Sequence, residues 1–295
     1  MRSDTNGKLS NPDKVFWPEE GYTKQDLANY YREIFPLLRP YVNDRLLTLE
    51  RCPDGMKGQC FYQKQKPQGM PAGTPTKLIK TATGKRKATD YVLGGMLSTQ
   101  LALVNLGCIP VHVAGMRAKT FPKSDWVCFD LDPSSGQFAD AARVALLVRD
   151  ALDLLGLHSY PKTSGSRGIH IFIPVRLGPT ADEVLKFAEE FSSRMAKSHP
   201  KEITVEHSIA QRGNRVYLDP FRNGLMQTVV SPYSVRRKPH APISTPLDWR
   251  EVSPKLDPSI FNLGNFRSRT KKDPWSDFFT NRQTLTKATA NLKKI

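Results

Sequence analysis

The alternation of apolar and polar positions is clearest at residues 126–133, where a β-forming stretch carries two carboxylates two positions apart. A strand places residues i and i+2 on the same face. Asp130 and Asp132 therefore point the same way, while Phe129 and Leu131 point into the core. This stretch predicts a strand with one buried face and one acidic face.

Four other stretches have apolar residues at the 3.6-residue spacing of amphipathic helices. They are residues 23–36, 90–106, 138–155 and 180–199. The first opens on a Thr-x-x-Asp cap and is expected to end at Pro36. The second has Asp90 as its N-cap and Gly107 as its end, and the last opens on a capping box.

Short runs of β-forming residues bounded by turn residues predict further strands. These strands are expected at residues 46–51, 60–64, 108–113, 169–173, 203–207 and 215–219. A Pro-Asp-Gly turn joins the first two into a hairpin. Beyond Pro242 the chain is Pro-rich and loop-like, with a short helix around residues 258–261. Residues 1–9 and the basic segment 267–295 are expected to be partly mobile.

Charge and composition narrow the class of protein. The chain has 295 residues, with 44 Lys and Arg against 28 Asp and Glu, a formal net charge of +16. This balance predicts a polyanionic partner, nucleic acid before an anionic membrane surface. No apolar run approaches the roughly 18–20 residues of a membrane span, and the N-terminus lacks a signal-peptide layout. The four cysteines have no CxxC spacing and are interpreted as free thiols of a cytosolic protein.

Two like charges on one strand face repel each other unless a cation neutralises them. Two divalent ions about 3.5–4 Å apart would do so, and they form the clamp used in phosphoryl and nucleotidyl transfer. Asp219 ends a predicted strand just before Pro220 and can complete such a site with Asp130 and Asp132. A solvent-exposed strand edge that happens to carry two aspartates is the alternative.

Residues 162–168 form a loop rich in glycine and hydroxyl groups, with cations at Lys162 and Arg167. Such a loop can present backbone N–H groups, hydroxyls and a guanidinium to a phosphate chain, although tight turns also need glycine. His170 follows on the face opposite the isoleucines of its strand. His112 stands alone in its strand, and a lone histidine is usually a satisfied core or rim residue.

Two further regions are candidates for nucleic-acid contacts. Residues 55–89 contain eight basic residues and no acidic one, and Phe61 and Tyr62 lie among them. One of these rings can be a base-stacking platform, but a solvated charged loop would look the same. Lys14 and Lys24 flank the start of the first helix, where unpaired backbone N–H groups favour a phosphate. Two solvated surface lysines are the alternative.

Together these residues resemble the polymerase domain of bacterial DNA ligase D, a member of the archaeo-eukaryotic primase superfamily. The resemblance covers residues from about 10 to about 263 in the order of the family. The matching stretches are Asn-Pro-Asp-Lys-Val-Phe-Trp-Pro from Asn11, Glu-Arg-Cys-Pro-Asp-Gly from Glu50, Phe-Tyr-Gln-Lys from Phe61, Asp-Trp-Val-Cys-Phe-Asp-Leu-Asp-Pro from Asp125, Lys-Thr-Ser-Gly-Ser-Arg-Gly-Ile-His from Lys162, Tyr-Leu-Asp-Pro-Phe-Arg-Asn from Tyr217, Tyr-Ser-Val-Arg from Tyr233 and Thr-Pro-Leu-Asp-Trp from Thr245.

This resemblance implies roles for individual residues. The metal-binding and catalytic carboxylates would be Asp130, Asp132 and Asp219. The incoming nucleotide and its triphosphate would be held by His112, Ser164, Arg167, His170, Arg222 and Arg236. The residues implied for DNA binding are Lys14, Lys24, Arg51, Phe61 and Tyr62. Within that set the lysines would grip a 5′-phosphate downstream of a gap or break, and the aromatic rings would meet the template base.

The resemblance also implies a fold and an activity. The fold would be an α+β single domain over residues 1–295, with two packed β-sheets, flanking helices and an RRM-like catalytic sheet. The activity would be template-directed nucleotidyl transfer in non-homologous end joining, using two Mn²⁺ or Mg²⁺ ions and preferring ribonucleotides. The partners would be gapped or broken DNA, nucleoside triphosphates, Ku and a DNA ligase. The protein would be a monomer in the cytoplasm, associated with the nucleoid and with no membrane.

Two positions depart from the family pattern. Arg167 stands where the family commonly has lysine, which replaces a point charge with a planar fork. Pro220 follows Asp219 where an aromatic residue is usual, which puts the end of that strand in question.

Three rival functions fit parts of the sequence. A two-metal nuclease would use the same carboxylates, but the loop at residues 162–168 argues for a triphosphate. A non-catalytic nucleic-acid-binding module would account for the charge of +16 without any carboxylate cluster. A stand-alone primase or translesion polymerase would share the chemistry and would not respond to a 5′-phosphate.

Overall fold

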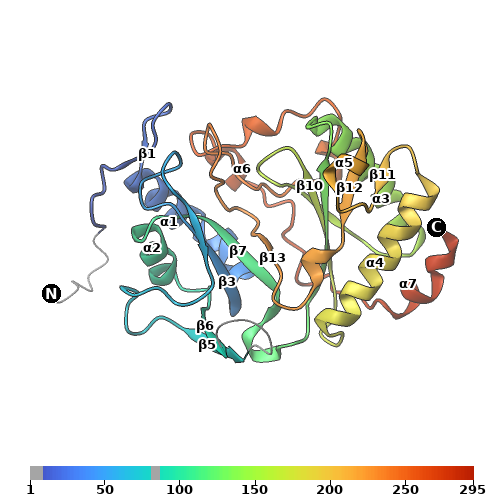
Figure 1. Cartoon of the computed structure of the whole chain (residues 1–295), viewed down its shortest axis with the longest axis horizontal. Coiled ribbons are helices and arrows are strands. Elements are labelled where there is room, and N and C mark those ends of the chain that lie inside the picture. Colours follow the sequence, from blue (N-terminus) through green and yellow to red (C-terminus); the bar gives the residue numbers. More distant parts are fainter. Residues whose placement is uncertain (1–8, 81–86) are drawn as a thin grey trace.

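The computed structural model describes residues 9–80 and 87–295. Lys85 and Arg86 of the basic segment, and most of the N-terminal segment expected to be mobile, lie outside these ranges. Two β-sheets dominate the fold, with helices on the outer side of each (Figure 1).

The helices and strands have these bounds. The four-stranded sheet has the order β13 (Thr228–Val230), β7 (Cys108–Arg117), β3 (Arg45–Arg51) and β4 (Phe61–Gln63). The five-stranded sheet has the order β11 (Ile203–Thr204), β12 (Val216–Asp219), β8 (Trp126–Pro133), β10 (Ile169–Pro174) and β9 (Tyr160–Thr163). Two small hairpins are β1 (Val15–Trp17) with β2 (Tyr22–Thr23), and β5 (Thr76–Lys80) with β6 (Ala88–Val92). The helices are α1 (Lys24–Val42), α2 (Leu97–Asn105), α3 (Phe138–Leu154), α4 (Ala181–Ser198), α5 (Ile209–Arg212), α6 (Arg267–Thr270) and α7 (Thr286–Asn291).

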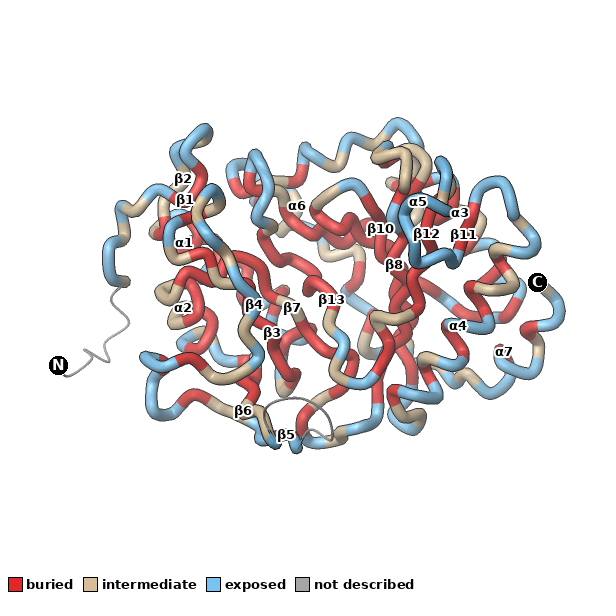
Figure 2. Tube along the Cα trace, viewed as in Figure 1, coloured by how far each residue is buried: buried red, intermediate tan, exposed pale blue. Residues whose placement is uncertain are grey.

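The strands of both sheets are largely buried (Figure 2), and each sheet packs one face against its own helices. Phe129, Leu131 and Ile171 pack against α3 and α4, and the register of β8 thereby turns its acidic face away from these helices. Leu47 and Val113 of the other sheet pack against α1 and α2. The opposite faces of the two sheets are turned towards each other, and Trp126, Cys128 and Phe172 of the five-stranded sheet join the core of the four-stranded sheet there.

The residues beyond 267 add aromatic side chains to the core. Trp275 and Phe278 are fully buried and stack with an interplanar angle of 10°. Phe172 of β10 lies 5.4 Å from the Trp275 ring, measured between ring centroids. None of the described helices is both long enough and apolar enough to cross a lipid bilayer.

The predicted end of the first helix at Pro36 is wrong. Helix α1 starts from the expected capping box of Thr23 and Asp26, but it continues through Pro36 and Pro40 to Val42. A proline inside a helix costs about 3 kcal/mol. Burial of Leu38, Tyr41 and Val42 in the last turn offsets a cost of this size, at about 1.5–3 kcal/mol for each large apolar side chain.

The predicted helix over residues 90–106 is half wrong. Residues up to Val92 form β6, and α2 begins only at Leu97. Gly94 and Gly95 break the pattern, because a side chain on Gly94 would lie 2.5 Å from the Val42 carbonyl oxygen and Gly95 has a φ of +114°. The chain therefore passes the end of α1 in a conformation that no helix allows.

The interpretation of all four cysteines as free thiols is wrong for two of them. Cys52 and Cys60 form a disulfide, with their Cα atoms 4.4 Å apart. The turn after β3 brings them together, because Gly55 adopts a φ of +77° and reverses the chain into β4. Cys108 and Cys128 are free and buried, as expected.

The other predicted elements are confirmed with small changes. The strand at residues 203–207 shrinks to the two residues of β11, whereas the strand from Cys108 extends to Arg117. The helix around residues 258–261 is a 3₁₀ turn, Pro258–Ile260.

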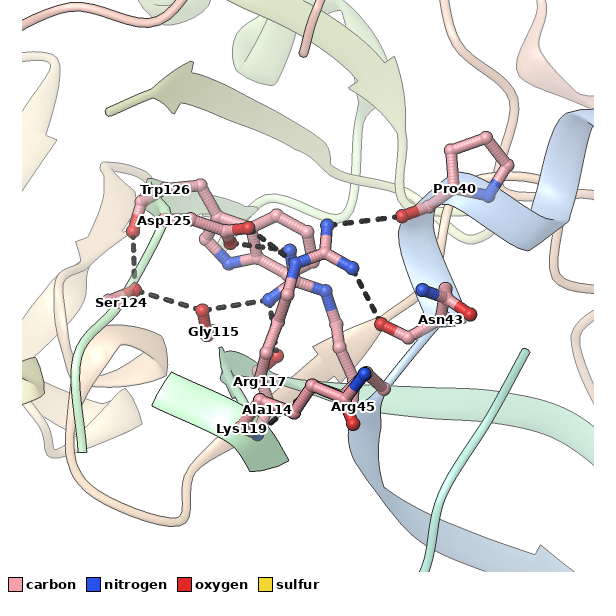
Figure 3. Close-up of polar contacts among 11 residues, drawn as sticks. Pro40, Asn43, Arg45, Ala114, Gly115, Arg117, Lys119, Ser124, Asp125 and Trp126 are labelled. Carbon is pink, nitrogen blue, oxygen red and sulfur yellow. Dashed lines mark hydrogen bonds and ion pairs between the residues drawn. The ribbon is translucent and has the colours of Figure 1, made fainter. Parts of the chain in front are cut away.

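A buried ion pair fixes the start of β8 to the other sheet (Figure 3). Arg45 of β3 is fully buried and donates to Asp125 Oδ1 at 2.5 Å and to the Gly115 carbonyl at 2.8 Å. Its guanidinium lies 3.4 Å over the Trp126 ring. Arg117 of β7 donates to the other oxygen of Asp125 at 2.7 Å. The acidic strand is therefore held at one end by charges from β3 and β7.

Candidate active site

One row of side chains crosses four strands of the five-stranded sheet. Lys162 on β9 pairs with His170 on β10, His170 with Asp130 on β8, and Asp130 with Asp219 on β12. Directly paired residues share a face of a sheet. The sequence separates Asp219 widely from Asp130, but the register makes them neighbours.

An arginine lies between the two paired carboxylates. Arg222, on the 3₁₀ turn Phe221–Asn223 after β12, places its Nε atom 3.2 Å from Asp130 Oδ2 and 3.3 Å from Asp219 Oδ2. The other oxygen of Asp130 is buried and has no hydrogen-bond partner, although His170 Nε2 lies 3.1 Å away. Asp132 is exposed one row further along β8. The sheet therefore places the three carboxylates on the neighbouring strands β8 and β12, with Asp130 and Asp219 directly paired.

The charges in this cluster are unevenly balanced. Burial disfavours ionisation of Asp130, but His170, Arg222 and Lys162 together hold its pKa below the ordinary value. The negative charge of Asp130, with burial, raises the pKa of Asp132 to about 7. Burial also raises the pKa of Asp219. The carboxylates thus repel one another beyond what Arg222 compensates, and an added cation would relieve this repulsion.

A divalent cation fits the donor set of this site. Asp130 offers an unpartnered buried oxygen, Asp132 faces the open space beside it, and carboxylates are hard oxygen ligands of the type that Mg²⁺ and Mn²⁺ take. In the described part of the chain, no three His, Cys, Asp or Glu side chains are already gathered around one ion position. Arg222 already supplies a positive charge between Asp130 and Asp219, so an ion would be held together with this guanidinium.

A cavity of about 380 Å³ lies over this row, between the two sheets. It is lined by Thr48, Tyr62, His112, Asp130, Asp132, Ser164, Ser166, His170, Arg222, Thr228, Val229, Val230, Arg236 and Lys238. The lining therefore includes most of the residues that the sequence nominated for metal and nucleotide. Asp219 and Arg167 are the nominated residues that do not line it.

The loop between β9 and β10 presents Ser164 and Ser166 to the cavity. The Ser164 hydroxyl accepts hydrogen bonds from the Ser166 and Gly168 amides, and its carbonyl accepts from Arg236 at 2.7 Å. Gly165 has a φ of +69°, and a Cβ there would lie 2.6 Å from the Arg236 side chain. Glycine therefore lets the arginine lie directly against the loop.

Arg167 points away from the cavity. It is exposed, and its Nη1 atom would lie 2.8 Å from a side chain on Gly136, in the turn after β8. The structure thus brings together five of the six predicted nucleotide-binding residues and leaves Arg167 at the rim.

His112 is part of a polar group that the sequence reasoning missed. Its Nε2 atom is buried, has no hydrogen-bond partner and lies 3.6 Å from Glu50 of β3. Glu50 also accepts from Arg237 at 2.8 Å and from the Tyr62 hydroxyl at 3.3 Å. Burial alone would raise the pKa of Glu50, but His112 and Arg237 lower it to about 2. The expectation of a satisfied core histidine is therefore wrong for Nε2, and His112 lines the cavity.

The aromatic pair on β4 is exposed next to this cavity. Phe61 is 44% exposed and Tyr62 is 66% exposed, so neither ring is needed in the core. The guanidinium carbon of Arg51 lies 5.3 Å from the centre of the Phe61 ring, and Arg51 also donates to Gln63. Arg51 and Phe61 are directly paired on one face of β3 and β4, whereas Tyr62 is paired with Glu50 on the other face and lines the cavity.

Lys14 and Lys24 lie at the start of α1. Lys14 is partly exposed and pairs with Asp54 at 2.6 Å, whereas Lys24 is buried and donates to the carbonyls of Ser10 and Asn105. The expectation of unpaired backbone N–H groups there is wrong. The first three are used, because Lys24 donates to Lys14, the next residue donates to Pro12, and the third donates to the Thr23 hydroxyl. Any anion at this position would have to be held by side chains.

Two other buried polar residues support the cluster without having been predicted as site residues. Asn223 holds the turn that carries Arg222, since its amide accepts from the Cys128 N–H and donates to the Cys128 carbonyl. Lys162 is fully buried at the end of the row, and burial lowers its pKa to about 7. The sequence placed Lys162 in a phosphate loop, and only the register with His170 shows its neighbour.

Comparison with known proteins gives consistent matches. Residues 23–275 match the family model described as LigD, primase-polymerase domain. The chain is 30% identical over 282 residues to the bifunctional non-homologous end joining protein LigD of Bacillus subtilis, covering 94% of this chain and 44% of that protein. It is 28% identical over 259 residues to the multifunctional LigD of Mycolicibacterium smegmatis, covering 87% of this chain and 33% of that protein. The chain therefore spans less than half of these relatives.

A solved structure has the same fold. The polymerase domain from Mycobacterium tuberculosis ligase D in complex with DNA superposes with a TM-score of 0.86 at 26% sequence identity. The match covers 94% of this chain and 99% of that chain.

Proposed function

The chain belongs to the family of LigD primase-polymerase domains, and on this premise we propose that it fills gaps and extends DNA ends during non-homologous end joining. Members of the family are metal-dependent, DNA-directed nucleotidyltransferases. The resemblance read from the sequence motifs and the expected α+β fold of two packed sheets are thereby confirmed. The observation that carries the proposal is the carboxylate row beneath a cavity lined by arginine and histidine.

Asp130, Asp132 and Asp219 would hold the divalent ions, Mn²⁺ or Mg²⁺. When bound, two such ions supply the lowered pKa of an attacking hydroxyl and the charge that stabilises a leaving pyrophosphate. The raised pKa of Asp132 supports this assignment, because the charge of this carboxylate is not fully compensated, and Asp130 has a buried oxygen to offer beside it.

The residues around the cavity would bind the nucleoside triphosphate. Arg222 and Arg236 place two guanidinium groups in the lining, and arginine forms paired hydrogen bonds with phosphate oxygens. His112 contributes a ring nitrogen without a partner from the opposite sheet. The two sheets would therefore enclose the nucleotide between them and exclude water from its phosphates. Arg167 would reach the phosphates only from the rim.

Arg51 and the exposed rings of Phe61 and Tyr62, on the two faces of β4, would meet the template strand, since exposed rings stack on bases of any sequence. We further propose that ribonucleotides are preferred, that Ku and a DNA ligase are partners, and that the domain acts as a monomer at the nucleoid in the cytoplasm. These assignments rest on the family resemblance and the basic charge of the chain.

One assay separates the proposal from its rivals. A labelled primer on a gapped duplex with a 5′-phosphate is incubated with each nucleotide type and with Mn²⁺ or Mg²⁺. The proposal predicts longer products that need the metal and form faster with ribonucleotides. Shorter products would identify a nuclease, and metal-independent binding without any incorporation would identify a binding module.

A second result is expected from the lysines at the start of α1. Lys14→Ala removes the more exposed ammonium group of the pair. It should lower gap filling on 5′-phosphorylated DNA about tenfold, because one charged contact is worth about 1.5 kcal/mol. Gap filling on DNA without that phosphate should be unchanged. Lys24→Ala should show the same loss and also unfold at a lower temperature, because the carbonyls of Ser10 and Asn105 lose the donor that the buried lysine supplies.

The matched control is Lys186→Ala, which removes an exposed lysine of α4. If the 5′-phosphate increased gap filling equally in Lys14→Ala, Lys24→Ala and the parent protein, the two lysines would be excluded as the phosphate-binding site. That result would also favour the stand-alone primase or translesion function.

A further inference from the structure

Lysine side chains are almost never fully buried unless they are paired. Lys162 has no exposed surface, and its Nζ atom lies 5.7 Å from the centre of the Phe172 ring. A methionine would fill such a space at no electrostatic cost, whereas burying an ammonium group is unfavourable unless it is hydrogen-bonded. Its hydrogen-bond partners are the hydroxyl of Ser244, at 2.5 Å, and Nδ1 of His170, at 2.9 Å.

The hydrogen bonds around Lys162 determine which ring nitrogen of His170 carries a proton. The Ser244 hydroxyl donates its single proton to the Thr163 carbonyl at 2.9 Å, so it accepts from Lys162. An ammonium group is a donor only, and it therefore also donates to Nδ1 of His170. A neutral imidazole with an accepting Nδ1 carries its proton on Nε2. That nitrogen lies 3.1 Å from Asp130 Oδ1, an oxygen that has no other partner.

We propose that Lys162 is a positioning residue that fixes His170 as the Nε2–H tautomer and thereby orients the carboxylate of Asp130. In the described part of the chain, Lys162 neither lines the cavity nor hydrogen-bonds a carboxylate, so any effect that it has on the orientation of Asp130 passes through His170. The inference rests on the proposed function in so far as Asp130 is a metal ligand. Partners one step removed from a metal commonly set the orientation of its ligands, and their loss lowers metal affinity or activity by about 10–100-fold.

The rival explanation is purely structural, with Lys162 serving only to fill the core and tie β9 to Ser244. A second alternative is a neutral lysine that accepts a hydrogen bond from a protonated Nδ1. It would leave Nε2 unprotonated and facing a carboxylate. The three explanations differ in the tautomer of His170 and in what happens to it when the lysine is removed.

The test is the nitrogen NMR spectrum of the histidine side chains in the whole chain, without metal and at one pH. The chain has six histidines, and the signals of His170 are assigned by their loss in His170→Gln. The expected result is an unprotonated Nδ1 and a protonated Nε2 in the parent protein. Lys162→Met should lose this single tautomer, and Lys162→Arg, which again supplies donors only, should restore it.

Metal binding provides the second measurement. Mn²⁺ affinity should fall about 10–100-fold in Lys162→Met and recover in Lys162→Arg. A protonated Nδ1 in the parent protein, which needs no variant to observe, would overturn the proposal. So would an unchanged tautomer and Mn²⁺ affinity in a folded Lys162→Met. Failure of the parent protein to extend any primer would instead refute the polymerase function and leave the tautomer result standing.

Discussion

Asp132→Ala is expected to lower the rate of primer extension about a hundredfold to a thousandfold and to leave DNA binding within about twofold of the parent protein. Asp132 is exposed to the cavity and makes no ion pair, so its removal disturbs no packing. What it removes is one of the three carboxylates that would hold the divalent ions, and positioned charge of this kind is worth about 3–4 kcal/mol in the transition state.

The stability of this variant gives an independent check. The negative charge of Asp130 raises the pKa of Asp132 to about 7, so the two carboxylates repel each other in the folded protein. Asp132→Ala relieves that repulsion, and its unfolding temperature should be equal to or above that of the parent protein. Activity is measured by primer extension and binding by fluorescence anisotropy with a gapped duplex.

Asp150→Ala is the matched control, because Asp150 is an exposed aspartate on α3 that pairs only with the adjacent Arg149. It should extend primers at the parental rate. Extension by Asp132→Ala at the rate of this control would refute the metal assignment.

The largest effect on stability is expected from Asp125→Asn. This change removes the charge that faces the fully buried guanidinium of Arg45. Burial alone would raise the pKa of Asp125, but Arg45 and Arg117 hold it below the ordinary value, so the carboxylate is ionised in the folded state. Loss of one partner of a buried ion pair costs about 3–5 kcal/mol, because the remaining charge is left uncompensated.

Thermal or denaturant unfolding measures this loss. The matched control is Glu190→Gln, which breaks the exposed ion pair with Arg194 on α4 and should change stability by less than about 1 kcal/mol. The double variant Arg45→Met with Asp125→Asn should recover part of the loss, since it removes both charges from the interior. If Asp125→Asn were as stable as Glu190→Gln, the pair would not hold β8 to the other sheet.

Local patterns predicted the elements whose structure is decided locally. The capping boxes at Thr23 and Thr180 each begin a helix where expected, and the acidic strand has the predicted faces. The predictions from sequence were wrong where contacts between residues far apart in the chain determine the structure. Helix α1 passes through Pro36 because its last turn is buried, and residues 90–92 join β5 because two glycines must pass the end of α1.

The site was predictable in its residue types and less so in its geometry. Asp219 was expected near Asp130 from its position at a strand end, and the structure pairs them directly. Glu50 and Lys162 were missed because their neighbours, His112 and His170, lie on other strands. Without the pairing of strands, a sequence does not tell which charged residue faces which histidine.

The single row that joins Lys162, His170, Asp130 and Asp219 bears on which changes in length this protein can tolerate. A residue inserted into or deleted from β8 reverses the faces of every position beyond it, so that Asp130 would enter the apolar layer beneath α3 and α4. Such a change would disperse the whole cluster at once, whereas added residues in the turn after α4, which is exposed, would leave it intact. Length variation among related proteins should therefore be confined to segments between the strands of this sheet.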